Sequence, residues 1–263
     1  MPRSTGQTTL AQTTPARKDS ATVNAAARGL SIYPSTTDLA ALNLAALNQE
    51  IIACTRCPRL IAHCRKVGEI KRRAYLDWDY WAKPVPGFGD PNARLLILGL
   101  APGAHGSNRT GRPFTGDGSG NFMYPVLHKA GFASQPTAIR REDGLELIDA
   151  YITAAVRCAP PENKPSPKEI GNCATFLDRE FAALTNVKVV VVLGKIAFDA
   201  YLNYLKRRGE LKSKSGILFG HGETYKLPDA ARCCVRIILH CRTLSQASSR
   251  RECFWTCSGR QGG

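Results

Sequence analysis

The sequence lacks several patterns that mark common classes of protein. No run approaches the roughly 20 apolar residues of a membrane-spanning helix, so we expect no association with a membrane. No apolar core follows a basic start at the N-terminus, which argues against a secretory signal. Neither nucleotide-binding pattern, G-x-x-x-x-G-K-S/T or G-x-G-x-x-G, occurs, and no internal repeat is visible. These absences predict a cytoplasmic protein and weaken a nucleotide-binding role.

Acidic residues are scarce relative to basic ones. The 263 residues include 36 Lys and Arg but only 21 Asp and Glu, which gives a formal net charge of +15. Clustered cations displace counterions from phosphate backbones, so a polyanionic partner is one interpretation. An ordinary protein of basic composition is the other. A basic segment from Arg65 to Arg73 precedes aromatic residues between Tyr75 and Trp81, which could serve nucleic acid or the core.

Cysteine is plentiful, with ten residues. In a reducing compartment, cysteines usually bind metals, carry out redox chemistry or are simply buried. Cys54 and Cys57 form a C-x-x-C pair, and a proline-rich segment lies between Cys158 and Cys173. Four thiolates suit zinc or an iron–sulfur cluster, and the spacing alone does not choose between them.

Strand and helix patterns alternate from residue 93 onward. Apolar runs predict strands at 95–98, 151–156, 187–193 and 235–239. Helical spacing predicts helices at about 120–131, 167–184 and 196–206, after an earlier helix that carries Leu39, Leu42, Leu47 and Ile51. This alternation predicts an α/β fold with a parallel sheet and helices on both faces.

A glycine-rich loop follows the first of these strands. It reads Gly99-Leu-Ala-Pro-Gly-Ala-His-Gly-Ser-Asn-Arg-Thr-Gly-Arg-Pro-Phe-Thr-Gly-Asp-Gly-Ser-Gly120. Open α/β sheets bind ligands at the carboxyl ends of their strands, and glycines let backbone amides approach a ligand. A plain surface loop is the alternative, but the concentration of Gly, His, Asn, Arg and Asp argues against it. We therefore expect a ligand site here.

Taken together, these motifs resemble the uracil-DNA glycosylase superfamily, specifically family 5, the type-B enzymes. The loop from Gly99 to Asp117 and the segment Ala154-Ala-Val-Arg-Cys-Ala-Pro-Pro-Glu-Asn-Lys-Pro165 carry the resemblance most specifically. Shorter matches are Val192-Leu-Gly-Lys-Ile-Ala197, Phe219-Gly-His-Gly222 and Leu227-Pro-Asp229. The resemblance covers about residues 45–232. It implies a DNA-repair enzyme that hydrolyses the N-glycosidic bond of uracil, with hypoxanthine and xanthine as further candidate bases.

The resemblance also implies a fold and a cofactor. The fold is three-layer α/β/α around a four-stranded parallel sheet. The cofactor is a [4Fe–4S] cluster, whose ligands are Cys54, Cys57, Cys158 and Cys173. The cluster would tie an N-terminal helical segment to the sheet without taking part in the hydrolysis. The implied partner is DNA that contains uracil or another deaminated base, and we expect a monomer associated with the nucleoid.

The expected binding residues lie in the glycine-rich loop. A base inside a duplex is inaccessible, so the nucleotide must be flipped into a pocket. By the resemblance, the base stacks on Phe114, for which core packing is the alternative. The backbone expected to contact the base and hold the attacking water is that of Gly99, Leu100, Ala101, Pro102 and Gly103. Since Leu100 and Ala101 have no polar side chain, we expect a dissociative cleavage in which DNA phosphates stabilise the sugar cation.

The expected catalytic residues are polar side chains of the same loop. The leaving base anion needs hydrogen-bond donors, for which His105 and Asn108 are candidates. Asp117 is expected to orient water or support the sugar cation, or else to cap the next helix. Arg109 and Arg112 are expected either to bind phosphate or to brace the loop.

The C-terminal part departs from the resemblance. Family members carry His-(Pro/Val)-Ser-x-x-Asn before an amphipathic helix, whereas this chain has His240-Cys-Arg-Thr-Leu-Ser-Gln-Ala-Ser248. We assign His240 as the family's catalytic His, and a reading-frame change or genuine divergence explains the rest. The alternative function is therefore a DNA-binding protein of the same fold with impaired catalysis, and a nucleotide-binding fold with zinc is a weaker third hypothesis.

The predicted domain organisation follows from these observations. Residues 1–36, rich in Thr, Ser and Ala, form a disordered tail, with a transit peptide as the alternative. Residues 37–240 form the glycosylase-like domain, and residues 241–263 form a divergent, disordered tail.

Overall fold

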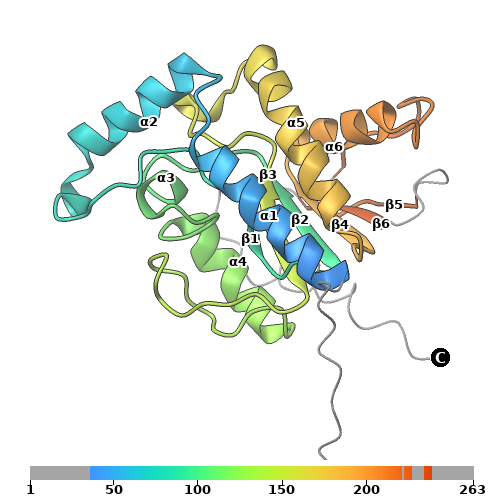
Figure 1. Cartoon of the computed structure of the whole chain (residues 1–263), viewed down its shortest axis with the longest axis horizontal. Coiled ribbons are helices and arrows are strands. Elements are labelled where there is room, and N and C mark those ends of the chain that lie inside the picture. Colours follow the sequence, from blue (N-terminus) through green and yellow to red (C-terminus); the bar gives the residue numbers. More distant parts are fainter. Residues whose placement is uncertain (1–35, 221, 227–233, 239–263) are drawn as a thin grey trace, which may run out of the picture. The chain divides into compact units, whose positions relative to one another are not determined.

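A six-stranded mixed sheet lies at the centre of the fold (Figure 1). The computed structural model describes residues 36–220, 222–226 and 234–238. The strand order is β1-β3-β2-β4-β6-β5. The strands are β1 Phe88–Gly89, β2 Leu95–Gly99, β3 Ala150–Ala154, β4 Val189–Leu193, β5 Thr224–Lys226 and β6 Cys234–Ile238.

The predicted parallel sheet is confirmed in its centre and wrong at its edges. β3, β2, β4 and β6 run parallel, and they match the four predicted strands. The edge strands β1 and β5, however, pair antiparallel with β3 and β6. β1 has two residues and β5 has three, which is too short to show an alternating pattern. Only their pairing with a neighbouring strand makes these segments extended.

Successive side chains of each inner strand point to opposite faces, and each face buries its own core. Leu96 and Leu98 of β2 pack on one face with α1, α5 and α6, whereas Leu95 and Ile97 pack on the other with α4. These helices are α1 Thr36–Ile52, α4 Gly118–Lys129, α5 Pro167–Ala183 and α6 Lys195–Arg207. Figure 1 shows α1 and α5 side by side across one face of the sheet. The described part of the chain is therefore a three-layer α/β/α arrangement, as predicted.

The first helix buries part of the predicted stripe. Leu44, Leu47 and Ile51 are buried at helical spacing, but Leu42 is 61% exposed. The pattern Leu44–Leu47–Ile51 follows the i, i+3, i+7 periodicity of one helix face, and Leu42 lies off that face. None of the helices in the described ranges is long and apolar enough to cross a membrane.

Local signals set where the helices begin. α5 starts with a capping box, in which the Ser166 side chain accepts from the Glu169 amide and the Glu169 carboxylate accepts from the Ser166 amide. Pro58 and Pro167 occupy first-turn positions of α2 (Pro58–Ile70) and α5, where the missing N–H costs no hydrogen bond. The other short elements are α2 Pro58–Ile70, α3 Ser107–Thr110, and the 3₁₀ turns η1 Arg73–Tyr75 and η2 Pro161–Asn163.

Candidate active site

A cavity of about 650 Å³ opens at the carboxyl end of β2. Its wall is the glycine-rich loop from Leu100 to Ser107, together with Phe114 and Asp117. Residues after β3 and β4, including Asn163 and Gly194, complete the wall. The carboxyl ends of three parallel strands thus contribute to one pocket, as expected of an open α/β sheet. Of the predicted residues, the cavity brings together Leu100, Ala101, Pro102, Gly103, His105, Phe114 and Asp117.

Phe114 is held against the end of β2 by two close backbone approaches. A Cβ at Gly99 would lie 2.9 Å from the Cζ atom of Phe114, so only glycine leaves room for the ring. A Cβ at Gly120 would collide with the Phe114 carbonyl oxygen. Phe114 has a φ of 51°, and its amide donates to Ser107 Oγ at 3.0 Å. The ring therefore packs partly on the core and also forms part of the cavity wall.

His105 lies in the cavity wall and is paired with Tyr80. The Tyr80 hydroxyl lies 3.0 Å from His105 Nδ1, and the two rings meet edge to face. Burial lowers the pKa of His105, and the charges of Arg72 and Arg109 lower it further. Burial also raises the pKa of Tyr80, so its hydroxyl keeps its proton. The lowered pKa favours the neutral imidazole, and the ring lies in the cavity wall.

Asp117 caps α4 and also faces the cavity. Its Oδ1 accepts from the amides of Ser119 and Gly120, each at 3.0 Å. Its Oδ2 lies against the loop, because a Cβ at Gly103 would be 3.0 Å from it and one at Gly106 would collide with it. Asp117 therefore caps α4, which is one of its two predicted roles. Because Asp117 also lies in the cavity wall, its other predicted role, orienting a water molecule or supporting the sugar cation, stays a prediction.

Asn108 is turned away from the cavity. Its side chain is fully buried, and Nδ2 donates to the carbonyls of Cys64 at 3.2 Å and Ala104 at 3.4 Å. Asn108 is also absent from the residues that line the cavity. These contacts tie the loop to α2, and the predicted donation to a leaving base would need this amide to exchange its partners.

Arg109 and Arg112 brace the loop. Arg109 donates to the His105 and Gly116 carbonyls, each at 2.8 Å. Its guanidinium lies 3.9 Å from the ring centres of both Tyr75 and Trp78. Arg112 is 3% exposed, donates to Thr115 Oγ1 at 2.9 Å and pairs with Asp143 at 2.8 Å. Of the two roles expected for these arginines, the contacts favour bracing.

Sequence reasoning did not assign several residues of the cavity wall to the site, among them Arg157, Asn163 and Gly194. Arg72 and Tyr75, which also line the cavity, were noted only as part of a basic and aromatic stretch. Arg157 and Asn163 lie within the motif from Ala154 to Pro165, so their place directly after a strand could have indicated them. Arg72 and Tyr75 come from a segment with no strand before it, so only the tertiary structure places them beside the loop.

Comparison with known proteins bears on this cavity. The sequence profile of the uracil DNA glycosylase superfamily matches residues 86–257, which include nearly all of the wall. The chain belongs to the uracil DNA glycosylase superfamily. Membership leaves the alternative of a nucleotide-binding fold without support.

Several curated relatives belong to the same superfamily. A type-5 uracil-DNA glycosylase of Thermus thermophilus is 53% identical over 180 residues, which cover 68% of this chain and 79% of the relative. A type-5 uracil-DNA glycosylase of Mycobacterium tuberculosis is 44% identical over 187 residues, covering 71% of this chain and 68% of the relative. One of Pyrobaculum aerophilum is 42% identical over 173 residues, covering 64% of this chain and 75% of the relative.

The superfamily match continues past the expected end of the resemblance. It runs to residue 257 and thus includes the segment after His240. His240 itself, and the predicted tails at 1–36 and 241–263, lie outside the described residues, except for Thr36 at the start of α1. The alternative of a catalytically impaired binding protein is not supported by these comparisons, whose named relatives are glycosylases.

The cysteines expected to bind a cluster gather where α2 and α5 meet the segment after β3. Cys57, Cys158 and Cys173 are buried in one apolar cluster with Leu60 and Val156. Cys54 is half-buried. Among the described residues, no group of three or more His, Cys, Asp or Glu side chains is spaced to hold a metal ion.

The donor set nevertheless has the chemistry that a [4Fe–4S] cluster requires. Burial raises the pKa of the Cys173 thiol, Arg157 opposes the rise, and the nearby thiols of Cys57 and Cys54 add to it. The thiols are thus close enough to interact, and a bound metal would offset the rise by stabilising the thiolates. Asn172 Nδ2 lies 3.4 Å from Cys57 Sγ, and the main chain of Arg157 is hydrogen-bonded to Cys173. Four thiols in an apolar setting, with N–H groups directed at sulfur, fit iron–sulfur ligation. The fifth cysteine, Cys64, is fully buried, as predicted.

Proposed function

We propose that this protein is a DNA-repair glycosylase that hydrolyses the N-glycosidic bond of uracil in DNA. One observation carries the proposal: in a member of the superfamily, the glycine-rich loop and Phe114 form a cavity at the carboxyl end of β2. A cavity of about 650 Å³ is within the range of small-molecule sites and has room for one extruded base.

The wall supports recognition of a flipped base. The base would stack on Phe114, whose ring position depends on Gly99 and Gly120. The loop amides from Leu100 to Gly106 would contact the base edge and hold a water molecule. Because Leu100 and Ala101 offer no side-chain base, the glycosidic bond would break first, and DNA phosphates would stabilise the sugar cation.

His105 is the leading candidate to assist the departing base. In the tautomer where the protonated Tyr80 hydroxyl donates to Nδ1, the neutral imidazole carries its proton on Nε2. Nε2–H would then donate to the anionic base as the bond breaks. A neutral imidazole suits this task across physiological pH because burial lowers the pKa of His105. Asn108 and Asp117 stay secondary candidates, since each already serves the loop.

We further infer that Cys54, Cys57, Cys158 and Cys173 hold a [4Fe–4S] cluster. When bound, the cluster would cross-link segments of the fold and would take no part in the hydrolysis. It would join α2 and α5 to the segment after β3, and so fix Asn108, which bonds to the Cys64 carbonyl on α2. We also infer a monomer that acts on the nucleoid in the cytoplasm, where DNA with uracil or another deaminated base is its substrate.

The direct test is uracil release from a defined duplex. Incubation of the purified protein with a duplex that contains a single uracil should leave an abasic site, detected as an alkali-labile break. A matching duplex with thymine at that position is the control. Absence of breaks with folded, iron-loaded protein would contradict the proposed function, and duplexes with hypoxanthine or xanthine would measure the base range.

Substitution of Phe114 should separate base binding from DNA binding. We expect Phe114→Ala to slow uracil excision by about 1–3 kcal/mol of activation free energy, the worth of one base–aromatic stack. Affinity for an undamaged duplex should stay the same, because phosphate contacts set it. Phe132→Ala is the control, since Phe132 packs on the same core but does not line the cavity. Equal losses in excision and in duplex affinity would assign Phe114 to the core alone.

The basic segment before the cavity should contribute to the salt dependence of DNA binding. Arg72 lines the cavity, and Arg73 is exposed beside it. We expect the logarithm of duplex affinity to fall with the logarithm of salt concentration by about 0.9 per neutralised phosphate. Replacing Lys71, Arg72 and Arg73 by Ala should make that slope shallower.

The chain offers a control of the same composition. Lys206, Arg207 and Arg208 are exposed at the end of α6, and their replacement by Ala removes the same formal charge. Equal slopes for the two triple variants would show that net charge, and not contact by residues 71–73, sets the salt dependence.

A further inference from the structure

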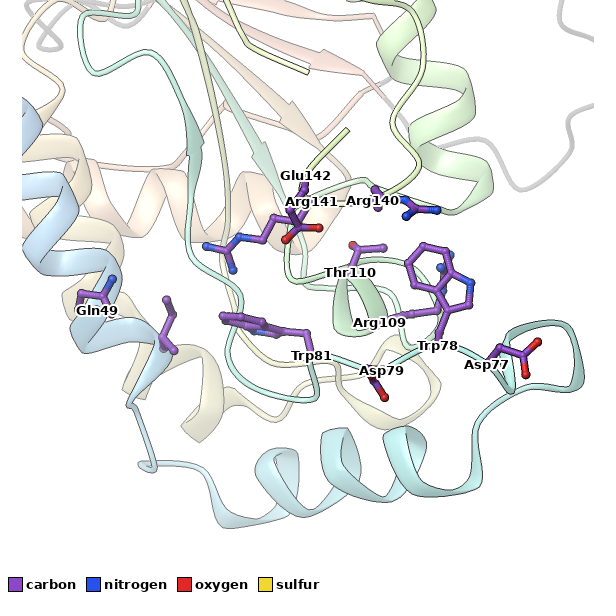
Figure 2. Close-up of a pocket in the computed structure, with 11 residues that line it drawn as sticks. Gln49, Asp77, Trp78, Asp79, Trp81, Arg109, Thr110, Arg140, Arg141 and Glu142 are labelled. Atoms are coloured by element: carbon purple, nitrogen blue, oxygen red, sulfur yellow. The ribbon is translucent and has the colours of Figure 1, made fainter. Parts of the chain in front are cut away.

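A second cleft of about 770 Å³ lies on the other side of α3 from the catalytic cavity. The two share a wall: Ser107 and Tyr75 line the cavity, while Arg109, Thr110 and Trp78 line the second cleft. Figure 2 shows Trp78 and Trp81 facing this cleft, with Thr110 between them. No residue expected to bind or cleave the base belongs to the second cleft.

Both indoles are already associated with cations. Arg140 lies 5.6 Å from the ring centre of Trp78, and Arg141 lies 4.6 Å from that of Trp81. Arg140 and Arg141 are exposed, and no ion pair in the described residues engages either side chain. Arg109 also lies 3.9 Å from the ring centre of Trp78, and Lys83 lies 5.5 Å from that of Trp81. A base would therefore stack on each indole where Arg140 or Arg141 now lies, with that exposed cation displaced toward the phosphate.

Three acids, Asp77, Asp79 and Glu142, line the cleft together with Arg109, Arg140 and Arg141. Figure 2 shows Asp77 and Asp79 directed away from the space between the indoles, so two of the three acids do not oppose the cations there. Arg109 is 3% exposed, and its Nη1 has no hydrogen-bond partner within the described part of the chain. Burial lowers the pKa of Arg109, so an anion nearby would relieve an unfavourable environment.

The geometry points to a binding site for single-stranded DNA, separate from the base-excision cavity. Bases stack on Trp78 and Trp81, which accept any base because every base has a flat π face. Phosphates pair with Arg140 and Arg141, which also contact the rings and can swing outward. A duplex fits less well, since its bases are already stacked on one another. The shared wall lets one strand extend from the cavity to the cleft.

The test uses a 12-nucleotide strand of thymidylate, which contains no uracil and so cannot report excision. We expect it to quench the tryptophan fluorescence of the full-length protein, because stacking brings bases against the indoles. Arg140→Ala with Arg141→Ala should weaken its binding by about tenfold, through lost phosphate contacts. Arg207→Ala with Arg208→Ala, which removes the same charge from α6, should not.

Uracil excision from a duplex should be unchanged in the Arg140→Ala, Arg141→Ala protein, which separates this inference from the proposed function. An equal loss of strand binding in both double variants would overturn the site, since net charge alone would explain it. Base stacking would be contradicted if an unlabelled uracil-free duplex competed as well as the single strand. Binding of the strand without quenching of the tryptophan fluorescence would contradict it too.

Discussion

Cys158→Ala and Cys173→Ala should each yield protein that lacks iron and fails to fold. Both thiols are buried in the apolar cluster beneath α2, and each is one of the four expected ligands. Structural metal centres contribute on the order of 10 kcal/mol to folding, comparable with the whole free energy of unfolding of a typical domain. Protein purified without oxygen should be brown and contain about four irons per chain, as four thiolate ligands imply. The measurements are iron content, absorbance and the yield of monomeric protein.

Cys64→Ala is the matched control for these variants. Cys64 is equally buried in the same cluster but is not among the four expected ligands. We expect this variant to keep its iron and its colour, with only the modest cost of losing a buried sulfur. Stoichiometric zinc without iron in the native protein, or full iron content after loss of Cys158, would refute the assigned ligand set.

Glu180→Ala should destabilise the fold by about 3–5 kcal/mol, because it leaves a buried arginine without its counter-ion. The Arg157 guanidinium pairs with Glu180 where their side chains are 2% and 0% exposed. Thr153 Oγ1 also donates to Glu180 Oε2 at 2.6 Å, so the carboxylate joins β3 to α5. The free energy of unfolding, measured by chemical denaturation of iron-loaded protein, should show the loss.

A neighbouring ion pair supplies the control. Arg179, the residue before Glu180, pairs with Glu50 on α1, and both side chains are 50% exposed. Glu50→Ala should change the free energy of unfolding little, because water replaces a surface partner. A second comparison replaces Arg157 by Met and Glu180 by Leu together. If this double variant is no more stable than Glu180→Ala, the loss comes from packing and not from an unpaired charge.

Much of the fold was predictable because its signals are local. The inner strands are short apolar runs, and α4, α5 and α6 begin within about two residues of their predicted starts. The glycine-rich loop was placed at the end of β2 because polar and glycine residues followed a buried strand. The motifs of that loop and of residues 154–165 were by themselves enough to indicate the superfamily.

The cavity wall was predictable only where it follows the strands. Leu100, Ala101, His105 and Phe114 lie in one continuous segment, so their proximity required little folding information. The pairing of His105 with Tyr80, 25 residues earlier, leaves no trace in local spacing. We predicted Asn108 as a donor to the base because its side-chain amide can donate a hydrogen bond. The direction of that side chain, however, depends on where the Cys64 carbonyl lies.

The sequence by itself determined the α/β class, the inner strands, the ligand loop, the candidate cluster thiols and the superfamily. Only the tertiary structure decided the antiparallel edges, the neutral His105–Tyr80 pair, the buried Arg157–Glu180 pair and the second cleft. Gly87 illustrates the reason: any Cβ there would collide with the Tyr151 hydroxyl and lie 2.7 Å from Glu180 Oε1. Periodicity and capping are set by residues a few positions apart, and the sequence displays them directly. Hydrogen bonds, ion pairs and close approaches depend on segments that meet only after the chain has folded.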